Sequence, residues 1–81
     1  MTSEDLFRVI EAGQPGPRVE VIGEFDSEDL AVSYAVGKQQ VNREAQHLWF
    51  VRKGEQAPSW VIDGDGLRRR PTTEEVEEYF G

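Results

Sequence analysis

Apolar and polar residues alternate along "RVEVIGEF", residues 18–25. Val19, Val21 and Phe25 take turns with neighbours that include two glutamates, which is typical of a strand with one wetter face. The preceding run, "DLFRVIEA", fits either a strand or a short helix capped by Ser3 and ended by Gly13. Its β-branched and aromatic residues, and the turn cluster "GQPGP" that follows, favour a β-hairpin over the helix.

A helical period follows the hairpin. Five apolar residues share one side at that spacing: Leu30, Ala31, Tyr34, Ala35 and Val41. Asp26 or Ser27 can accept hydrogen bonds from the first free amides, and two acids in the first turn suit the helix dipole. We therefore predict a helix from about Ser27 to about Asn42. Gly37 lowers its stability, so we expect either a close-packing point there or fraying beyond it.

Two further apolar runs come after this helix. "QHLWFVRKG" consists mainly of strand formers, "GEQAP" reads as a connection, and "SWVIDGDG" resumes the strand pattern. This order predicts a second hairpin with Trp49 and Trp60 on facing strands, where aromatic pairs stabilise the ladder.

The final stretch, "VIDGDGLRRRPTTEEVEEYFG", reads as a turn, a basic connector and a terminal helix. Residues 63–66 have the composition of a turn. Thr72 and Glu75 have the spacing of a capping box, in which each side chain satisfies a free backbone amide of the other residue. Val76, Tyr79 and Phe80 would form the apolar side of the helix.

These elements predict an α+β fold. We expect two layers: a mostly antiparallel four-stranded sheet with element order ββαββα, and both helices on one face. The 81 residues suit a single small domain, spanning 1–81, with a modest core. The chain has no cysteine, which excludes disulfide bonds, thiolate metal sites and a cysteine nucleophile.

The charge balance is acidic. Sixteen acids and nine bases give a net charge of −7, which disfavours direct binding to nucleic acid. The acidity fits a salt-adapted (halophilic) or GC-rich genome, and it also fits a protein that imitates DNA or binds a basic partner. No stretch approaches the roughly 20 apolar residues of a membrane span, and the first residues do not resemble a signal sequence. We expect a cytoplasmic protein without membrane contact.

The acidic turn has part of the pattern of a calcium-binding loop. Asp63, Asp65 and Glu74 fall at ligand positions one, three and twelve. Position five is Leu67, however, and Arg68 occupies the sixth position, where the loop needs glycine. Phosphate-loop spacing is absent as well, so we predict neither a metal nor a cofactor here.

Catalytic candidates are equally weak. His47 is the only histidine and has no acid at ligand spacing, which favours a surface role on a strand. No serine lies in a nucleophile-elbow pattern. Asp63 and Asp65 could exchange protons, but a glycine-flanked turn is exposed to water. We therefore expect a non-enzymatic protein with no catalytic residues.

Two groups of residues remain as contact candidates. Arg68, Arg69 and Arg70 either pair with nearby acids or bind an anion or a partner. Trp49 and Trp60 either lie under the helices or line a sheet face left open on one side. The leading hypothesis is a protein-interaction module, with self-association on that face possible. The alternatives are an acidic nucleic-acid mimic that inhibits a DNA-binding partner, and an anion or small-ligand binder using Arg68–Arg70.

Overall fold

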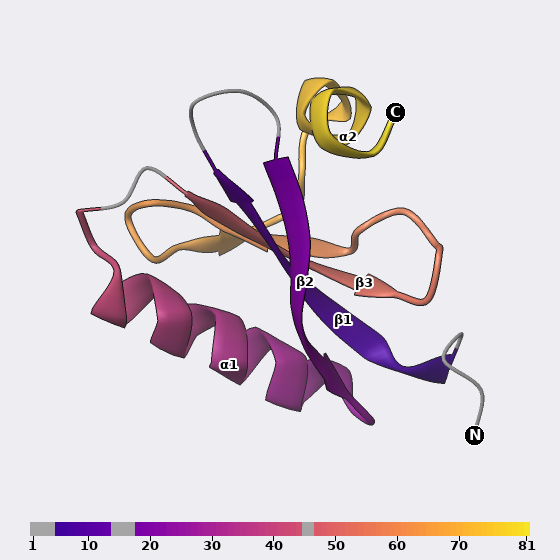
Figure 1. Ribbon diagram of the computed structural model, residues 1–81, viewed down its shortest axis with the longest axis horizontal. Coiled ribbons are helices and arrows are strands. Elements are labelled where there is room, and N and C mark those ends of the chain that lie inside the picture. The colour runs from indigo at the N-terminus through magenta and orange to yellow at the C-terminus, as the bar shows by residue number, and fades with distance from the viewer. Residues whose placement is uncertain (1–4, 14–17, 45–46) are drawn as a thin grey trace.

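The computed structural model describes residues 5–13, 18–44 and 47–81. Its elements, in chain order, are β1 (Phe7–Gly13), β2 (Arg18–Phe25), α1 (Glu28–Val41), β3 (Leu48–Lys53), β4 (Trp60–Ile62), β5 (Arg68–Arg69) and α2 (Thr73–Phe80). The fold is α+β, with two helices and one antiparallel sheet (Figure 1). Ser3 and most of the predicted "GQPGP" turn lie outside the described residues.

The sheet has five strands in the order β2-β1-β3-β4-β5, and every neighbouring pair is antiparallel. Both predicted hairpins, β1–β2 and β3–β4, are confirmed, and residues 7–13 form a strand rather than a helix. The prediction of four strands in the order ββαββα was incomplete. The turn at 63–66 sends the chain back along β4, so that Arg68 and Arg69 pair with Ile62 and Val61. The observed order is ββαβββα.

The two helices lie on opposite faces of the sheet (Figure 1). α1 covers a cluster that includes Trp49, Val51 and Ile62, whereas α2 packs over Phe50 and Val61. The prediction that both helices share one face was therefore wrong. Because successive side chains of a strand point to opposite faces, the apolar run in β3 gives the sheet two apolar faces that both require cover.

The first helix follows its sequence signals. The backbone N–H of Leu30 donates to Ser27 Oγ at 3.1 Å, and the helix ends at Val41 with Asn42 as its C-cap. Both interpretations of Gly37 were wrong. The helix continues beyond it, and a Cβ atom there would meet no heavy atom within 4 Å.

A bulge interrupts the pairing of β1 with β2. Val9 pairs with Gly23 but Ile10 pairs with Val21, so that Ile22 is the extra residue. The hydroxyl of Tyr34 on α1 donates to the Ile22 carbonyl at 3.3 Å. The bulge thus divides β2, which lies at one edge of the described sheet, into 18–21 and 23–25.

Candidate functional site

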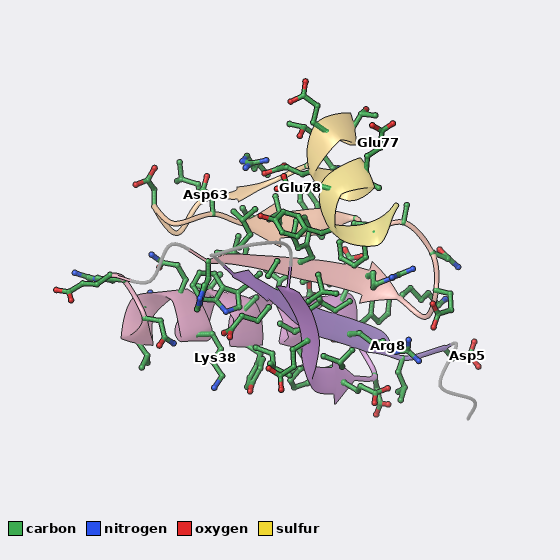
Figure 2. All side chains as sticks on the ribbon, turned by 45° about the horizontal axis from the view of Figure 1, so that its top comes forward. Asp5, Arg8, Lys38, Asp63, Glu77 and Glu78 are labelled. Carbon is green, nitrogen blue, oxygen red and sulfur yellow. The ribbon has the colours of Figure 1, made fainter. Side chains whose placement is uncertain are left out.

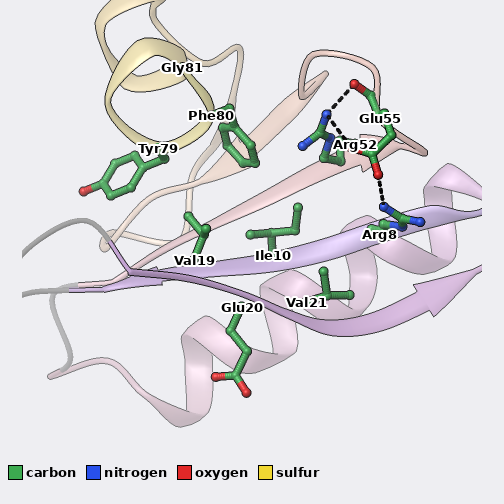
Figure 3. A pocket seen from close by; sticks show the side chains of 10 residues that line it. All are labelled: Arg8, Ile10, Val19, Glu20, Val21, Arg52, Glu55, Tyr79, Phe80 and Gly81. Atoms are coloured by element: carbon green, nitrogen blue, oxygen red, sulfur yellow. Dashed lines mark hydrogen bonds and ion pairs between the residues drawn. The ribbon is translucent and has the colours of Figure 1, made fainter.

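A groove of about 390 Å³ lies between α2 and β2, on the face of the sheet opposite α1 (Figure 3). Its lining residues come from β1, β2, β3, the β3–β4 loop and the end of α2: Arg8, Ile10, Val19, Glu20, Val21, Arg52, Glu55, Tyr79, Phe80 and Gly81. A volume of this size lies near the lower end of the range of small-molecule pockets.

The apolar part of the groove is made by alternate residues of two paired strands. Ile10 of β1 is almost fully buried and forms the floor, and its partner Val21 lies beside it on β2. Val19 and Val21 are 47% and 49% exposed, and both point into the groove, whereas Glu20 between them points away (Figure 3). Strand alternation therefore places two half-exposed valines at the sheet edge, facing α2.

The wall opposite the valines is the last turn of α2. Tyr79 and Phe80 both pack on Phe50, with ring centroids 5.6 and 5.1 Å apart. The Phe80 ring meets Phe50 edge-on, a favourable arrangement for two aromatic rings. These contacts hold the helix on the sheet and fix the width of the groove.

One end of the groove is polar but internally paired. Arg8 Nη1 lies 2.8 Å from Glu55 Oε1, and Arg52 Nε donates to the Gln56 carbonyl at 2.8 Å. Arg52 also donates to the Glu55 carbonyl, and its guanidinium lies 5.0 Å from the centre of the Phe80 ring. Both arginine side chains are largely covered. Their charges are thus engaged in closing this end of the groove.

Trp49, predicted as a partner contact, is fully buried beneath α1. Its indole N–H donates to Glu11 Oε2 at 3.0 Å, which satisfies the one polar atom of the ring. The His47 ring packs edge-on against it at 5.9 Å. Trp49 therefore contributes to the core and offers no surface to a partner in this structure.

Trp60 is half-buried on the same face as Trp49. Its indole N–H donates to Glu28 Oε1 of α1 at 3.0 Å. The guanidinium carbons of Arg68 and Arg70 lie 4.5 and 4.0 Å from the centre of its ring, both close enough for cation–π attraction. The tryptophan thus connects α1 to the strand that sequence reasoning missed.

The three predicted arginines do not converge on one site. Arg69 points to the face of α2, where it forms two hydrogen bonds with Glu75 and lies 3.5 Å from Asp63. The hydrogen bonds from Arg69 lower the pKa of Glu75 to about 2, and the same contacts raise the pKa of Arg69. Arg68 and Arg70 project to the opposite face, over Trp60. The expectation that these arginines pair with nearby acids is therefore confirmed for Arg69, which pairs with Glu75.

The acidic turn has a structural role in this fold. Asp63 Oδ1 accepts hydrogen bonds from the backbone N–H groups of Asp65 and Leu67, at 3.0 and 3.1 Å. Gln39 of α1, which is buried, donates to the Gly64 carbonyl at 2.8 Å. Within residues 5–13, 18–44 and 47–81, no three His, Asp or Glu side chains are grouped closely enough to hold a metal ion.

Sequence reasoning missed the groove itself. The sequence predicts the alternation of Val19 and Val21, but it also predicts α2 on the same face as α1, whereas α2 covers the opposite face. A signal was present, because β3 alternates two sets of buried apolar residues, and the second set needs a cover of its own.

The chain matches no family model, no curated protein and no solved structure in the three comparisons. Of the helices in the described part of the chain, none has the length and apolar character needed to cross a membrane.

Proposed function

We propose that this protein is a non-enzymatic binding module, and that its groove receives a segment of a partner protein carrying apolar and basic side chains. The observation that carries the proposal is the pair Val19 and Val21. Both are half-exposed on an edge strand and face the aromatic end of α2 across the groove. Apolar surface arranged in a concave site gains free energy when a partner covers it.

Charge supports a basic partner. The chain has a net charge of −7, and the two elements that border the groove carry exposed acids, including Glu77 and Glu78 on α2 (Figure 2) and Glu24 on β2. The arginines at the groove, Arg8 and Arg52, are covered and paired with acceptors. A basic segment would therefore be attracted to this site, and its association would weaken as salt is added.

The same charge disfavours the simplest alternative occupant, a second copy of the chain, because two copies carry like charges. It also leaves the nucleic-acid mimic less well supported, since exposed acids belong to both helices and to β2. Anion binding at Arg68–Arg70 is weakened because Arg69 is paired with Glu75. A cytoplasmic location remains part of the proposal.

Selection from a random displayed-peptide library tests the proposal without presuming how the peptide binds. We expect enriched peptides to combine apolar and basic residues. The variant Val21→Ser should weaken their binding about fivefold, because part of the buried apolar area is lost. Val41→Ser is the matched control, because Val41 is 83% exposed at the end of α1, away from the groove lining. Equal binding by both variants would contradict the proposal.

Light scattering at low and high salt tests whether a second copy of the chain occupies the groove instead. We expect the mass of one chain at low salt, where repulsion between like-charged copies is strongest. A dimer that persists at low salt and dissociates in Val21→Ser would instead identify the groove as a self-association surface.

A further inference from the structure

Among the residues that the structure describes, no strand pairs with the outer side of β2. β2 lies at the edge of the sheet, and its other side pairs with β1 along seven residues of that strand. The opposite edge strand, β5, has two residues, so it offers far less backbone to a partner. Unpaired N–H and C=O groups along an edge are a template for a further strand.

We infer that the partner segment adds as a sixth strand along residues 18–21, with apolar side chains beside Val19 and Val21 and a basic side chain beside Glu20. This inference rests on the proposed function and specifies how the groove is occupied.

The valines define the apolar positions of the incoming strand. In paired strands, directly opposite residues point to the same face. Residues of the partner opposite Val19 and Val21 would thus point toward the groove, where Tyr79 supplies the facing wall. The residue between them would point to the other face of the sheet, as Glu20 does.

Glu20 defines the basic position. It pairs directly with Glu11 of β1, so two acids stand opposite each other on one face. Like charges in directly opposite positions destabilise a sheet. On its other side Glu20 faces the unpaired edge, where a lysine or arginine of an added strand would offset this repulsion. The expected recognition pattern is apolar, basic, apolar at consecutive positions.

The bulge limits the length of the added strand. At Ile22 the register shifts, and the Ile22 carbonyl already accepts a hydrogen bond from Tyr34. A regular ladder can therefore extend over residues 18–21 before it meets the irregularity. The site suits a short segment, for which NMR can measure weak binding.

The experiment uses a capped peptide of alternating valine and lysine with glycine at each end, titrated into the isotopically labelled protein. Two derivatives carry N-methyl groups on one or the other alternate set of amides. Only one set can donate to β2, because alternate amides of a strand point to opposite sides. We expect one derivative to bind about tenfold more weakly and the other to bind nearly as well as the parent peptide.

A second arm tests the pairing with Glu20. Glu20→Gln should weaken the valine–lysine peptide about threefold, consistent with loss of an exposed charge pair. The same substitution should hardly change the affinity for a peptide that carries norleucine in place of lysine. Glu44→Gln is the control, because Glu44 is exposed after α1 and does not line the groove.

The outcomes separate this inference from the proposed function. If both methylated derivatives bind equally, or if display-selected peptides bind the groove as helices, strand addition is overturned while the groove remains the docking site. If Val21→Ser weakens the binding of neither the alternating peptide nor any displayed peptide, both the proposed function and the inference are overturned.

Discussion

The guanidinium of Arg69 and the carboxylate of Glu75 are joined by two hydrogen bonds of 2.8 Å each. The same carboxylate accepts the backbone N–H of Thr72 at 2.9 Å and so completes the capping box of α2. One side chain therefore caps the second helix and ties it to β5. Since α2 forms a wall of the groove, this contact also supports the candidate site.

Removing the charge of Glu75 should change the pH dependence of stability. Its pKa is lowered from 4.5 to about 2 by the hydrogen bonds from Arg69. A carboxylate with a lowered pKa contributes stability that is complete above pH 4.5 and is lost as the pH falls toward 2. We expect Glu75→Gln to lower the free energy of unfolding by about 1 kcal/mol at pH 7, because solvent screens the pair.

Chemical denaturation at a series of pH values measures this effect. The difference between Glu75→Gln and the parent protein should shrink as the pH falls from 4.5 toward 2. Glutamine retains one acceptor oxygen for the capping box, so the substitution removes the charge and one of the two hydrogen bonds from Arg69. Glu74→Gln, at an exposed position in the same turn, is the control. A difference that stays constant over this range would contradict the assignment.

Gly66 should resist replacement by alanine. Its φ of 81° lies in the left-handed region, and an added Cβ would be 2.8 Å from Gln39 Oε1. We expect Gly66→Ala to lower the free energy of unfolding by about 1–2 kcal/mol. Gly64→Ala is the matched control in the same turn, since a Cβ there would meet nothing within 4 Å. Thermal unfolding should give Gly66→Ala a lower melting temperature than Gly64→Ala. Equal melting temperatures would refute this explanation.

Gly37 should accept alanine with a gain in stability. It lies inside α1, where an added Cβ would meet no neighbouring atom within 4 Å. We expect Gly37→Ala to raise the free energy of unfolding by about 1 kcal/mol, because alanine has the higher helix propensity. Urea denaturation measures the gain. A loss of stability would show that the residue makes a close contact absent from this structure.

Phe80 should be important for the second helix. Its ring packs edge-on against Phe50 and lies beneath the guanidinium of Arg52. We expect Phe80→Ala to lower the free energy of unfolding by about 2 kcal/mol, less than for a fully buried phenylalanine. Val41→Ala, at a position that is 83% exposed, should change it by less than about 0.5 kcal/mol. In Phe80→Ala, the rate of amide hydrogen exchange should increase more in α2 than in the other elements. An unchanged rate in α2 would argue against this packing.

Local signals in the sequence predicted most of the elements. The cap at Ser27, the capping box of Thr72 and Glu75, and the period-two runs of both hairpins each depend on residues that are close together along the chain. Such signals act through backbone amides and side chains within one turn or one ladder, so the sequence states them directly.

The sequence had no comparable signal for β5. Arg68 and Arg69 lack the apolar residues that mark a strand, and their pairing depends on the turn at 63–66 returning the chain along β4. Trp49 illustrates the same limit for burial, because an aromatic residue in a strand can face either side of the sheet until the cover of each side is known.

By itself the sequence determined the two helices with the residues at which they begin, the first four strands, and the acidic charge of the whole chain. The tertiary structure alone decided that α2 covers the face opposite α1, and thereby placed Tyr79 across from Val19 and Val21. The physical reason is that β3 is apolar on both sides. Because apolar side chains of β3 point to both faces of the sheet, each face must be covered by a helix. Which helix covers which face depends on contacts between residues far apart in the chain.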